Sequence, residues 1–294
     1  MKTLEELALT PALATALANG GFAVPTPIQA QAIPLALDGH DIMGLAQTGT
    51  GKTLAFGIPM LDAIMRTPGA PAPKTAKALI LAPTRELVNQ ITQTLKALTQ
   101  KTKIRVNVVV GGQSIGKQIQ VLSRGTDVLV ATPGRLFDLL ERGGVDLSKT
   151  QQLVLDEADQ MLDIGFIHAL RKIVPFLSEE RQTLLFSATM SKQMDQLSRA
   201  YLTNPRKVQV NPPNVAADKI EQSVRFVEKP GKPRVLREVL GKHPDVATLV
   251  FARTKHGAER LKKALVADGF AATSVHGNKS QSLRDRAIKQ FRAG

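Results

Sequence analysis

Residues 46–53, with the sequence Ala-Gln-Thr-Gly-Thr-Gly-Lys-Thr, have the spacing most specific for chemistry in this chain. They follow an apolar run and open a helical pattern. Glycines let backbone N–H groups curl around phosphate oxygens, and the start of the helix adds positive potential. The motif usually begins with glycine, and alanine stands there in this chain. The predicted phosphate-binding residues are Ala46, Gln47, Thr48, Gly49, Thr50, Gly51, Lys52 and Thr53.

An acidic cluster follows a second apolar run, Leu-Val-Leu at 153–155. Open α/β sheets bind ligands at the carboxyl ends of their strands. Asp156 is therefore expected to coordinate Mg²⁺ together with Thr53, and Glu157 to orient or deprotonate an attacking water. The alternative is a helix cap, because Asp and Glu favour helix starts. The phosphate-binding loop upstream, with Lys52 reaching the β- and γ-phosphates, favours the catalytic interpretation.

Short β-branched runs alternate with helical patterns over residues 1–210, which we predict to be one domain. Most of these runs are apolar on both faces, as in parallel strands covered by helices on each side. The pattern predicts an α/β fold with a mostly parallel sheet and helices on both faces. The predicted strands are 42–46, 78–82, 104–110, 127–131, 152–156, 183–187 and 207–210, and the predicted helices are 52–65, 85–99, 134–141, 166–177 and 191–202.

The alternation breaks at the proline-containing stretch 211–220, which we interpret as an interdomain linker. A second alternation follows in residues 221–294, about half the length of a typical domain, so we expect a partial second domain. Its predicted strands are 222–227, 247–252 and 271–275, and its predicted helices are 232–241, 255–267 and 280–292.

The net charge of +14, from 39 basic and 25 acidic residues, suggests a polyanionic partner. A generally basic, solvated surface is an equally open alternative. Aromatic residues make up only 4% of the chain, with no tryptophan, which argues against recognition by base stacking. Contacts to a nucleic-acid backbone are therefore favoured.

The absence of cysteine excludes disulfides, thiolate metal sites and thiol nucleophiles, and it is consistent with a reducing compartment. No stretch approaches the ~20 apolar residues needed to span a membrane. The N-terminus lacks the pattern of a signal peptide. We therefore expect a soluble, cytoplasmic protein with no membrane partner.

The motifs, taken in order, resemble those of DEAD-box RNA helicases of superfamily 2. The letters DEAD stand at 156–159, and Gly21-Phe22 with Pro25-Thr26-Pro27-Ile28-Gln29 resembles the Q motif. The motifs at 250–254 and at Gln281 with Arg284 are similar to elements of the family's second domain. The stretch 276–281 is most similar to the bacterial RhlE-type branch. Three elements resemble those that hold the RNA backbone: Pro83-Thr84-Arg85-Glu86-Leu87, Gly111-Gly112 and Thr132-Pro133-Gly134-Arg135.

The resemblance implies an ATP-dependent RNA helicase with a RecA-like P-loop domain and an incomplete second RecA-like domain. ATP and Mg²⁺ are the implied cofactors, and RNA, held by its backbone, is the implied partner; protein partners are not indicated. Gln29 would read the adenine edge, with Phe22 and Thr26 beside it, and Arg284 would contact RNA or the strand that carries the motif at 250–254. The implied catalytic residues are Lys52, Asp156, Glu157, Ser187 and Thr189, the last two linking the nucleotide to the RNA site.

Two departures from the family pattern bear on activity. Leu4 stands where the family usually has an aromatic residue that stacks on adenine. Motif V and the arginine-bearing HRxGRxxR motif VI are absent from the 294 residues. Such arginines contribute roughly 10³–10⁵ in rate, so we expect this chain to bind ATP and RNA but to be impaired in turnover. The alternatives are a non-catalytic RNA-binding or regulatory helicase half, and a DNA helicase or translocase of the same superfamily.

Overall fold

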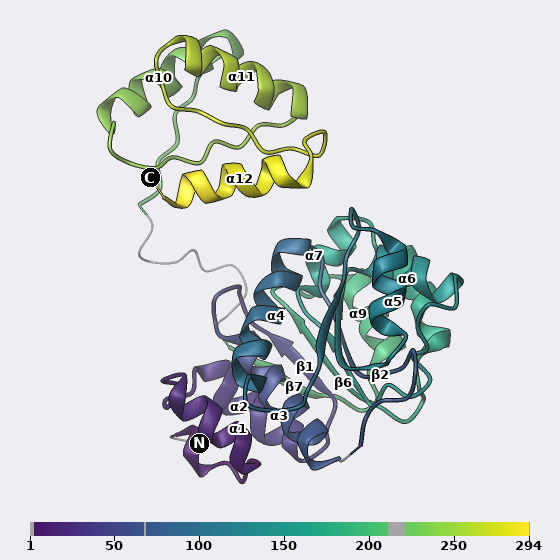
Figure 1. Ribbon diagram of the computed structural model, residues 1–294. Helices are drawn as coiled ribbons and strands as arrows, with labels where there is room; N and C mark the ends of the chain where they lie inside the picture. Colours follow the sequence, from purple (N-terminus) through teal and green to yellow (C-terminus); the bar gives the residue numbers. More distant parts are fainter. Residues whose placement is uncertain (1–2, 68, 211–220, 294) are drawn as a thin grey trace. The chain divides into compact units, whose positions relative to one another are not determined.

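The computed structural model describes residues 3–67, 69–210 and 221–293. The chain divides into two compact units, Met1–Ala216 and Ala217–Gly294, which are described separately below (Figure 1). The predicted linker at 211–220 lies outside the described residues. Within the described residues, no helix has both the length and the apolar character needed to cross a membrane.

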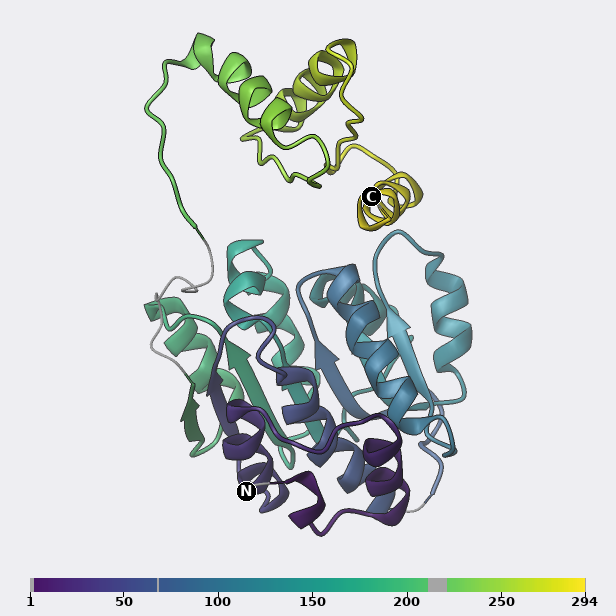
Figure 2. The same cartoon turned by 90° about the vertical axis from the view of Figure 1, so that its left-hand side faces the viewer.

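The first unit is built on a seven-stranded sheet in the order β3-β4-β2-β5-β6-β1-β7. All neighbouring strands pair in parallel, and Figure 2 shows them running in one direction. The seven predicted strands are confirmed. They are β1 (Ile42–Leu45), β2 (Ala76–Leu81), β3 (Val106–Val109), β4 (Thr126–Ala131), β5 (Gln152–Leu155), β6 (Gln182–Ser187) and β7 (Arg206–Gln209).

Two apolar cores lie on opposite faces of this sheet, because successive strand residues point to opposite sides. Ile80 of β2 belongs to one core, and its neighbours Leu79 and Leu81 belong to the other. The first face is covered by α1 (Pro11–Asn19), α2 (Pro27–Leu37), α3 (Lys52–Arg66) and α4 (Arg85–Thr99). The second is covered by α5 (Ile115–Leu122), α6 (Pro133–Glu141), α7 (Ala158–Asp163), α8 (Ile167–Ile173) and α9 (Lys192–Tyr201) (Figure 1).

The predicted helix 166–177 is shorter than expected. It is divided into α8 and a 3₁₀ turn, η2 (Val174–Phe176). Pro175 has no backbone N–H to donate and clashes with a preceding carbonyl, which explains the break. A second 3₁₀ turn, η1 (Leu4–Glu6), contains Leu4, which is 3% exposed and packs in the first core. The Leu4 side chain is therefore packed inside the protein rather than exposed.

The second unit is helical in its described part. It contains η3 (Lys229–Gly231), α10 (Lys232–Lys242), α11 (Lys255–Ala267) and α12 (Gln281–Arg292), which confirms the three predicted helices. The predicted strands 222–227, 247–252 and 271–275 are wrong, since no strand occurs within residues 221–293. Phe226 and Phe251 are 98% and 95% exposed. The composition of the three segments suits strands, but a strand also needs neighbours that pair with its backbone. These segments have no such neighbours within residues 221–293.

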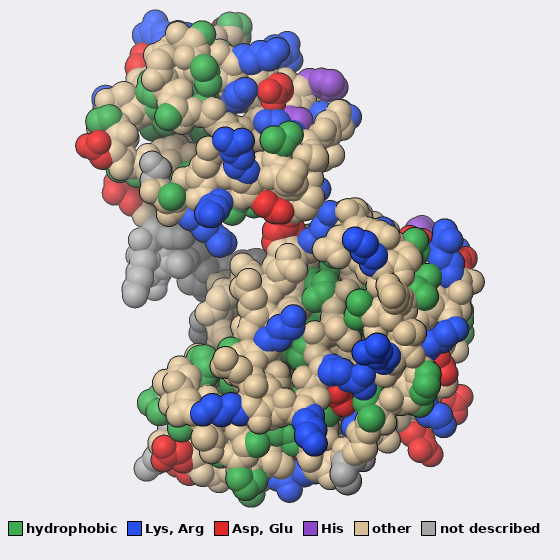
Figure 3. Space-filling view, viewed as in Figure 1, with side chains coloured by type: hydrophobic (Ala, Val, Ile, Leu, Met, Phe, Trp, Pro, Cys, Tyr) green, Lys and Arg blue, Asp and Glu red, His purple; other side chains and the backbone are tan. Residues whose placement is uncertain are grey.

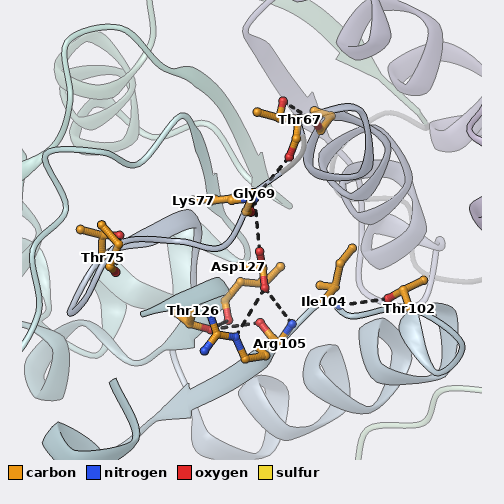
Figure 4. Close-up of polar contacts among 12 residues, drawn as sticks. Thr67, Gly69, Thr75, Lys77, Thr102, Ile104, Arg105, Thr126 and Asp127 are labelled. Carbon is orange, nitrogen blue, oxygen red and sulfur yellow. Dashed lines mark hydrogen bonds and ion pairs between the residues drawn. The ribbon is translucent and has the colours of Figure 1, made fainter. Parts of the chain in front are cut away.

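The amino-terminal edge of the sheet is held by a buried carboxylate, Asp127 at the start of β4 (Figure 4). Its Oδ2 accepts a hydrogen bond of 2.9 Å from the backbone N–H of Arg105, and its Oδ1 lies 3.4 Å from Lys77 Nζ. Lys77 Nζ also donates to the carbonyl of Gly69 at 2.6 Å. Asp127 thus connects three strands and the loop after α3 at the edge opposite the sequence motifs.

We predict that Asp127→Asn lowers the free energy of unfolding of the chain. One buried acceptor and its ion pair with Lys77 are lost, a change of about 1–3 kcal/mol. Chemical denaturation measures the effect. Asp195→Asn is the control, because Asp195 is 44% exposed and pairs with Arg199 at the surface, where such pairs contribute about 0–1 kcal/mol. Equal losses in the two variants would contradict the assignment.

Candidate active site

The sequence motifs of the first unit gather at the carboxyl edge of its sheet. The phosphate-binding loop follows β1, the acidic cluster follows β5, and residues 187–189 follow β6, which lies between β1 and β5. The three other elements follow β2, β3 and β4. Parallel strands place all their carboxyl ends on one side, so segments far apart in sequence become neighbours.

The loop 46–51 turns at two positions that favour glycine. Gly49 and Gly51 have φ values of 83° and 91°, in the region that other residues rarely adopt. A Cβ on Gly51 would lie 2.5 Å from the side-chain nitrogen of Gln29. The Thr50 hydroxyl donates to the carbonyl of Gln47 at 2.7 Å and closes the turn. The loop then enters α3 at Lys52.

Lys52 is a buried cation whose charge is incompletely balanced. Its side chain is 5% exposed, and its Nζ lies 3.7 Å from Oδ1 of Asp156. Within the described residues, this Nζ has no hydrogen-bond partner. A buried ammonium group without hydrogen bonds is costly, and a phosphate oxygen above the loop would supply the missing acceptor. The site therefore fits an anionic phosphate.

Asp156 is a buried carboxyl group with a raised pKa. Burial raises its pKa, the positive charge of Lys52 lowers it and the negative charge of Glu157 raises it, and the net pKa is about 6. The backbone N–H of Glu157 donates to Asp156 Oδ1 at 3.0 Å. A divalent cation would favour the ionised form by direct attraction.

The donor set of the site also fits Mg²⁺. Mg²⁺ in nucleotide sites takes one or two protein oxygens and completes its shell with phosphates and water. Asp156 and Thr53 are the residues present for this role. In the part of the chain that the structure describes, no group of three or more His, Cys, Asp or Glu side chains gathers to hold a metal by itself.

Glu157 adopts an unusual backbone conformation, with φ 50° and ψ 51°. Its Oε1 accepts a hydrogen bond of 3.0 Å from the hydroxyl of Thr48 in the phosphate-binding loop. A non-glycine residue in this left-handed region is strained and is found mostly where surrounding structure holds it. The conformation turns the carboxylate of Glu157 toward the loop.

Gln29 lies against the phosphate-binding loop rather than apart from it. Its Nε2 donates to the carbonyl of Gly51 at 2.9 Å, and its Oε1 accepts from the backbone N–H of Thr26 at 3.0 Å. The side-chain amide has two N–H donors, so one remains for a ligand. Phe22 is 38% exposed, and its ring covers Gly20, where a Cβ would lie 2.7 Å away.

Asp159 joins the acidic cluster to the segment after β6, a function that the sequence did not indicate. Its Oδ2 accepts from the backbone N–H groups of Ala188 and Thr189 at 3.1 and 2.9 Å, and from the Thr189 hydroxyl at 3.0 Å. The buried Ser187 hydroxyl donates to the Thr189 carbonyl at 2.7 Å. Only the pairing of β5 with β6 reveals these contacts.

The three remaining elements of the first unit lie together at the other half of the edge. Thr84 caps α4 by accepting from the N–H of Leu87 at 3.2 Å. The Arg85 guanidinium covers the glycine pair, and a Cβ on Gly112 would lie 2.3 Å from it. Arg135 Nη1 donates to the carbonyl of Gln113 at 2.9 Å. The residues brought to this half of the edge are Pro83, Thr84, Arg85, Glu86, Gly111, Gly112, Thr132, Pro133, Gly134 and Arg135.

Arg284 belongs to the second unit, on the first turn of α12. Its Nε is buried and has no hydrogen-bond partner among the described residues. The predicted contact of Arg284 with RNA therefore concerns the second unit alone and stays a prediction.

Comparison with known proteins agrees with this arrangement. Residues 26–197 match the family model described as DEAD/DEAH box helicase, and residues 231–294 match the helicase conserved C-terminal domain. The chain is 40% identical over 296 residues to DEAD-box ATP-dependent RNA helicase 30 of Arabidopsis thaliana, covering 100% of this chain and 50% of that protein. It is 41% identical over 293 residues to ATP-dependent rRNA helicase rrp3 of Emericella nidulans, covering 99% of this chain and 62% of that protein.

The fold is similar to a solved structure as well. A crystal structure of a DEAD box protein from the hyperthermophile Methanococcus jannaschii matches with a TM-score of 0.66 and 34% identity, covering 99% of this chain and 77% of that one. The first unit thus has the RecA-like fold that was predicted. The chain spans between about half and three fifths of the curated relatives it matches. By these matches and its motifs, the chain belongs to the DEAD/DEAH box helicase family.

Proposed function

We propose that these residues form the ATP-binding and RNA-binding parts of an ATP-dependent RNA helicase, which couples RNA-stimulated ATP hydrolysis to local unwinding of RNA duplexes. The observation that carries the proposal is the buried Lys52 Nζ, which lacks a hydrogen-bond acceptor among the described residues. This Nζ lies beside Asp156 at the carboxyl edge of the sheet. The three elements that resemble RNA-backbone-binding motifs follow β2, β3 and β4 at the same edge. The names of the two curated relatives, both RNA helicases, support the same activity.

In the nucleotide half of the site, each residue has a distinct task. Lys52 neutralises the β- and γ-phosphates, and the loop 46–51 wraps them with backbone N–H groups. Asp156 and Thr53 would hold Mg²⁺, which when bound would supply positive charge to the transferred γ-phosphoryl group and the departing ADP. Glu157 orients or deprotonates the attacking water. The base is held at Phe22, Thr26 and Gln29.

The nucleic-acid half contacts the phosphate backbone. The elements after β2, β3 and β4 offer a hydroxyl, glycine backbone and arginines, which contact phosphates without reading bases. Binding should therefore show little sequence preference and a strong dependence on salt. Asp159 connects the segment 187–189 to the nucleotide-binding residues, because it accepts a hydrogen bond from Thr189 and lies two residues from Glu157.

Surface charge contributes less to this proposal than the motifs do. On the face of the first unit in Figure 3, Lys and Arg side chains are scattered rather than gathered into one patch. The RNA assignment therefore depends on the edge elements. The proposal has three further parts. The stretch 276–281 supports membership of the RhlE-type branch, and the lack of cysteine supports a cytoplasmic location. The arginine motif missing from the 294 residues supports slow turnover by these residues alone.

The direct test is ATP hydrolysis by the 294-residue chain, with and without single-stranded RNA, at two salt concentrations. We expect ATP and RNA binding, with RNA affinity falling at high salt. Lys52→Ala should weaken ATP binding on the order of 100-fold, because a charge-assisted hydrogen bond to phosphate contributes up to ~3 kcal/mol. Unchanged nucleotide affinity in that variant would exclude the phosphate role of Lys52. Strong RNA-stimulated turnover would contradict the slow turnover proposed for the 294 residues alone. Binding of both ligands with no stimulation by RNA at all would favour the non-catalytic alternative.

Glu157→Gln should retain ATP binding and lose hydrolysis. The amide preserves the shape of the side chain but cannot accept the proton of the attacking water, a loss of roughly 10²–10⁴ in rate. Single-turnover hydrolysis with bound ATP measures it. Glu180→Gln, an exposed position, is the matched control. Turnover at the unmodified rate in Glu157→Gln would rule out this residue as the one that handles the water.

Binding of Mg²⁺ with ADP should strengthen as pH rises from 5 to 7.5. Because the pKa of Asp156 is about 6, its carboxyl group is mostly protonated at pH 5 and must lose a proton to bind the metal. The resulting penalty is roughly tenfold at pH 5. Titration calorimetry measures the affinity. The Asp156→Asn variant measures the part of the pH dependence that comes from protonation of ADP itself. An identical pH profile in both proteins would contradict the role of Asp156.

A further inference from the structure

Gln118 is a buried polar residue that belongs to none of the sequence motifs. It lies on α5, is 6% exposed, and points its amide at the glycine turn after β3. Its Nε2 donates to the carbonyl of Val110 at 2.9 Å and lies 3.3 Å from Oε1 of Gln113. Its Oε1 accepts from Nη1 of Arg135 at 3.2 Å.

The chemistry of the partners requires an amide at this position. Arg135 can only donate, so an oxygen must face it, and the carbonyl of Val110 can only accept, so an N–H must face that. A carboxylate would place negative charge against the carbonyl of Val110, and an apolar side chain would remove the bonds to Val110 and to Arg135. A buried amide with donors and acceptors matched in this way defines one geometry.

These bonds hold the glycine turn at both of its ends. Gln118 binds the carbonyl of Val110 before the turn, and Arg135 binds the carbonyl of Gln113 after it. Between them, Gly112 has φ 73° and lies under the guanidinium of Arg85. The starts of α4 and α6 and the turn after β3 therefore form one connected group, with Gln118 as the link from α5.

Arg135 is itself largely engaged within the protein. Its side chain is 14% exposed, and its Nε lies 3.8 Å from Asp138 Oδ2. Both bonds of its Nη1 are made to the turn and to Gln118. The direction of Arg135, and with it the start of α6, is set by these partners.

We propose that Gln118 is a positioning residue for RNA binding, which fixes the glycine turn against Arg135 so that both present phosphate-binding groups in register. The inference rests on the proposed function. Gln118 itself does not touch RNA; it sets the spacing of the groups that do.

The test compares Gln118→Met with Gln120→Met, an exposed position on the same helix. Binding of a fluorescent single-stranded oligouridylate to the full chain is measured over a salt series, with Mg²⁺ and a non-hydrolysable ATP analogue. We expect Gln118→Met to weaken RNA binding on the order of fivefold, which corresponds to the loss of one ordinary intramolecular hydrogen bond. The slope of log affinity against log salt should fall by about 0.7, one phosphate contact to a single strand. Affinity for the ATP analogue should not change.

The salt slope separates positioning from a purely structural role, because partial unfolding reduces the active fraction without altering the slope. Gln118→Asn, too short to reach both partners, provides a second variant that keeps the amide and should show the same two losses. Unmodified affinity and slope in both variants would overturn the inference, as would equal losses of RNA and nucleotide binding. If Gln118→Met and Gln118→Asn bind RNA like the unmodified chain while Arg135→Ala does not, only the positioning role fails. Absence of RNA binding by the unmodified chain would remove the proposed function and this inference together.

Discussion

The parallel pairing of β6 between β1 and β5 is the constraint on which the site depends. Leu45 at the end of β1 lies opposite Ser187, and Leu155 at the end of β5 lies opposite Leu185. This register brings the phosphate-binding loop, the acidic cluster and residues 187–189 to one edge. A shift of one residue would reverse every side chain on the strand, and the two apolar cores on either face oppose such a shift.

Burial makes the charges at this edge responsive to a ligand. Lys52 and Asp156 are both almost fully buried and 3.7 Å apart, so neither is fully solvated. Removing charges from water costs more than one imperfect ion pair returns. A bound phosphate and a cation would complete the pairing of both groups. The strained backbone of Glu157 is held beside them by Thr48, from the same loop that would surround the phosphates.

The two edges of the sheet use carboxylates in different ways. Asp127, at the amino-terminal edge, is held by a lysine and a backbone N–H, and it stabilises the fold. Asp159, at the carboxyl edge, accepts three hydrogen bonds from residues 188 and 189, and it connects two chemical elements. Gln118 connects the remaining elements through a buried amide. Hydrogen-bonded groups of this kind fix the geometry of one loop relative to the next, because each donor must face an acceptor and each acceptor a donor.

The sequence alone determined the seven strands of the first unit, its fold class and the position of the glycine-rich loop between β1 and α3. These follow from local patterns: apolar runs, and glycines with a lysine at fixed spacing. Tertiary structure decided what depends on partners distant in the chain. Asp159 meets Thr189 across 30 residues, and Gln118 meets Arg135 across 17; neither spacing leaves a sequence signal. Leu4 packs in the core, and the segments predicted as strands in residues 221–293 are unpaired, because burial and strand pairing depend on neighbours that local composition does not specify.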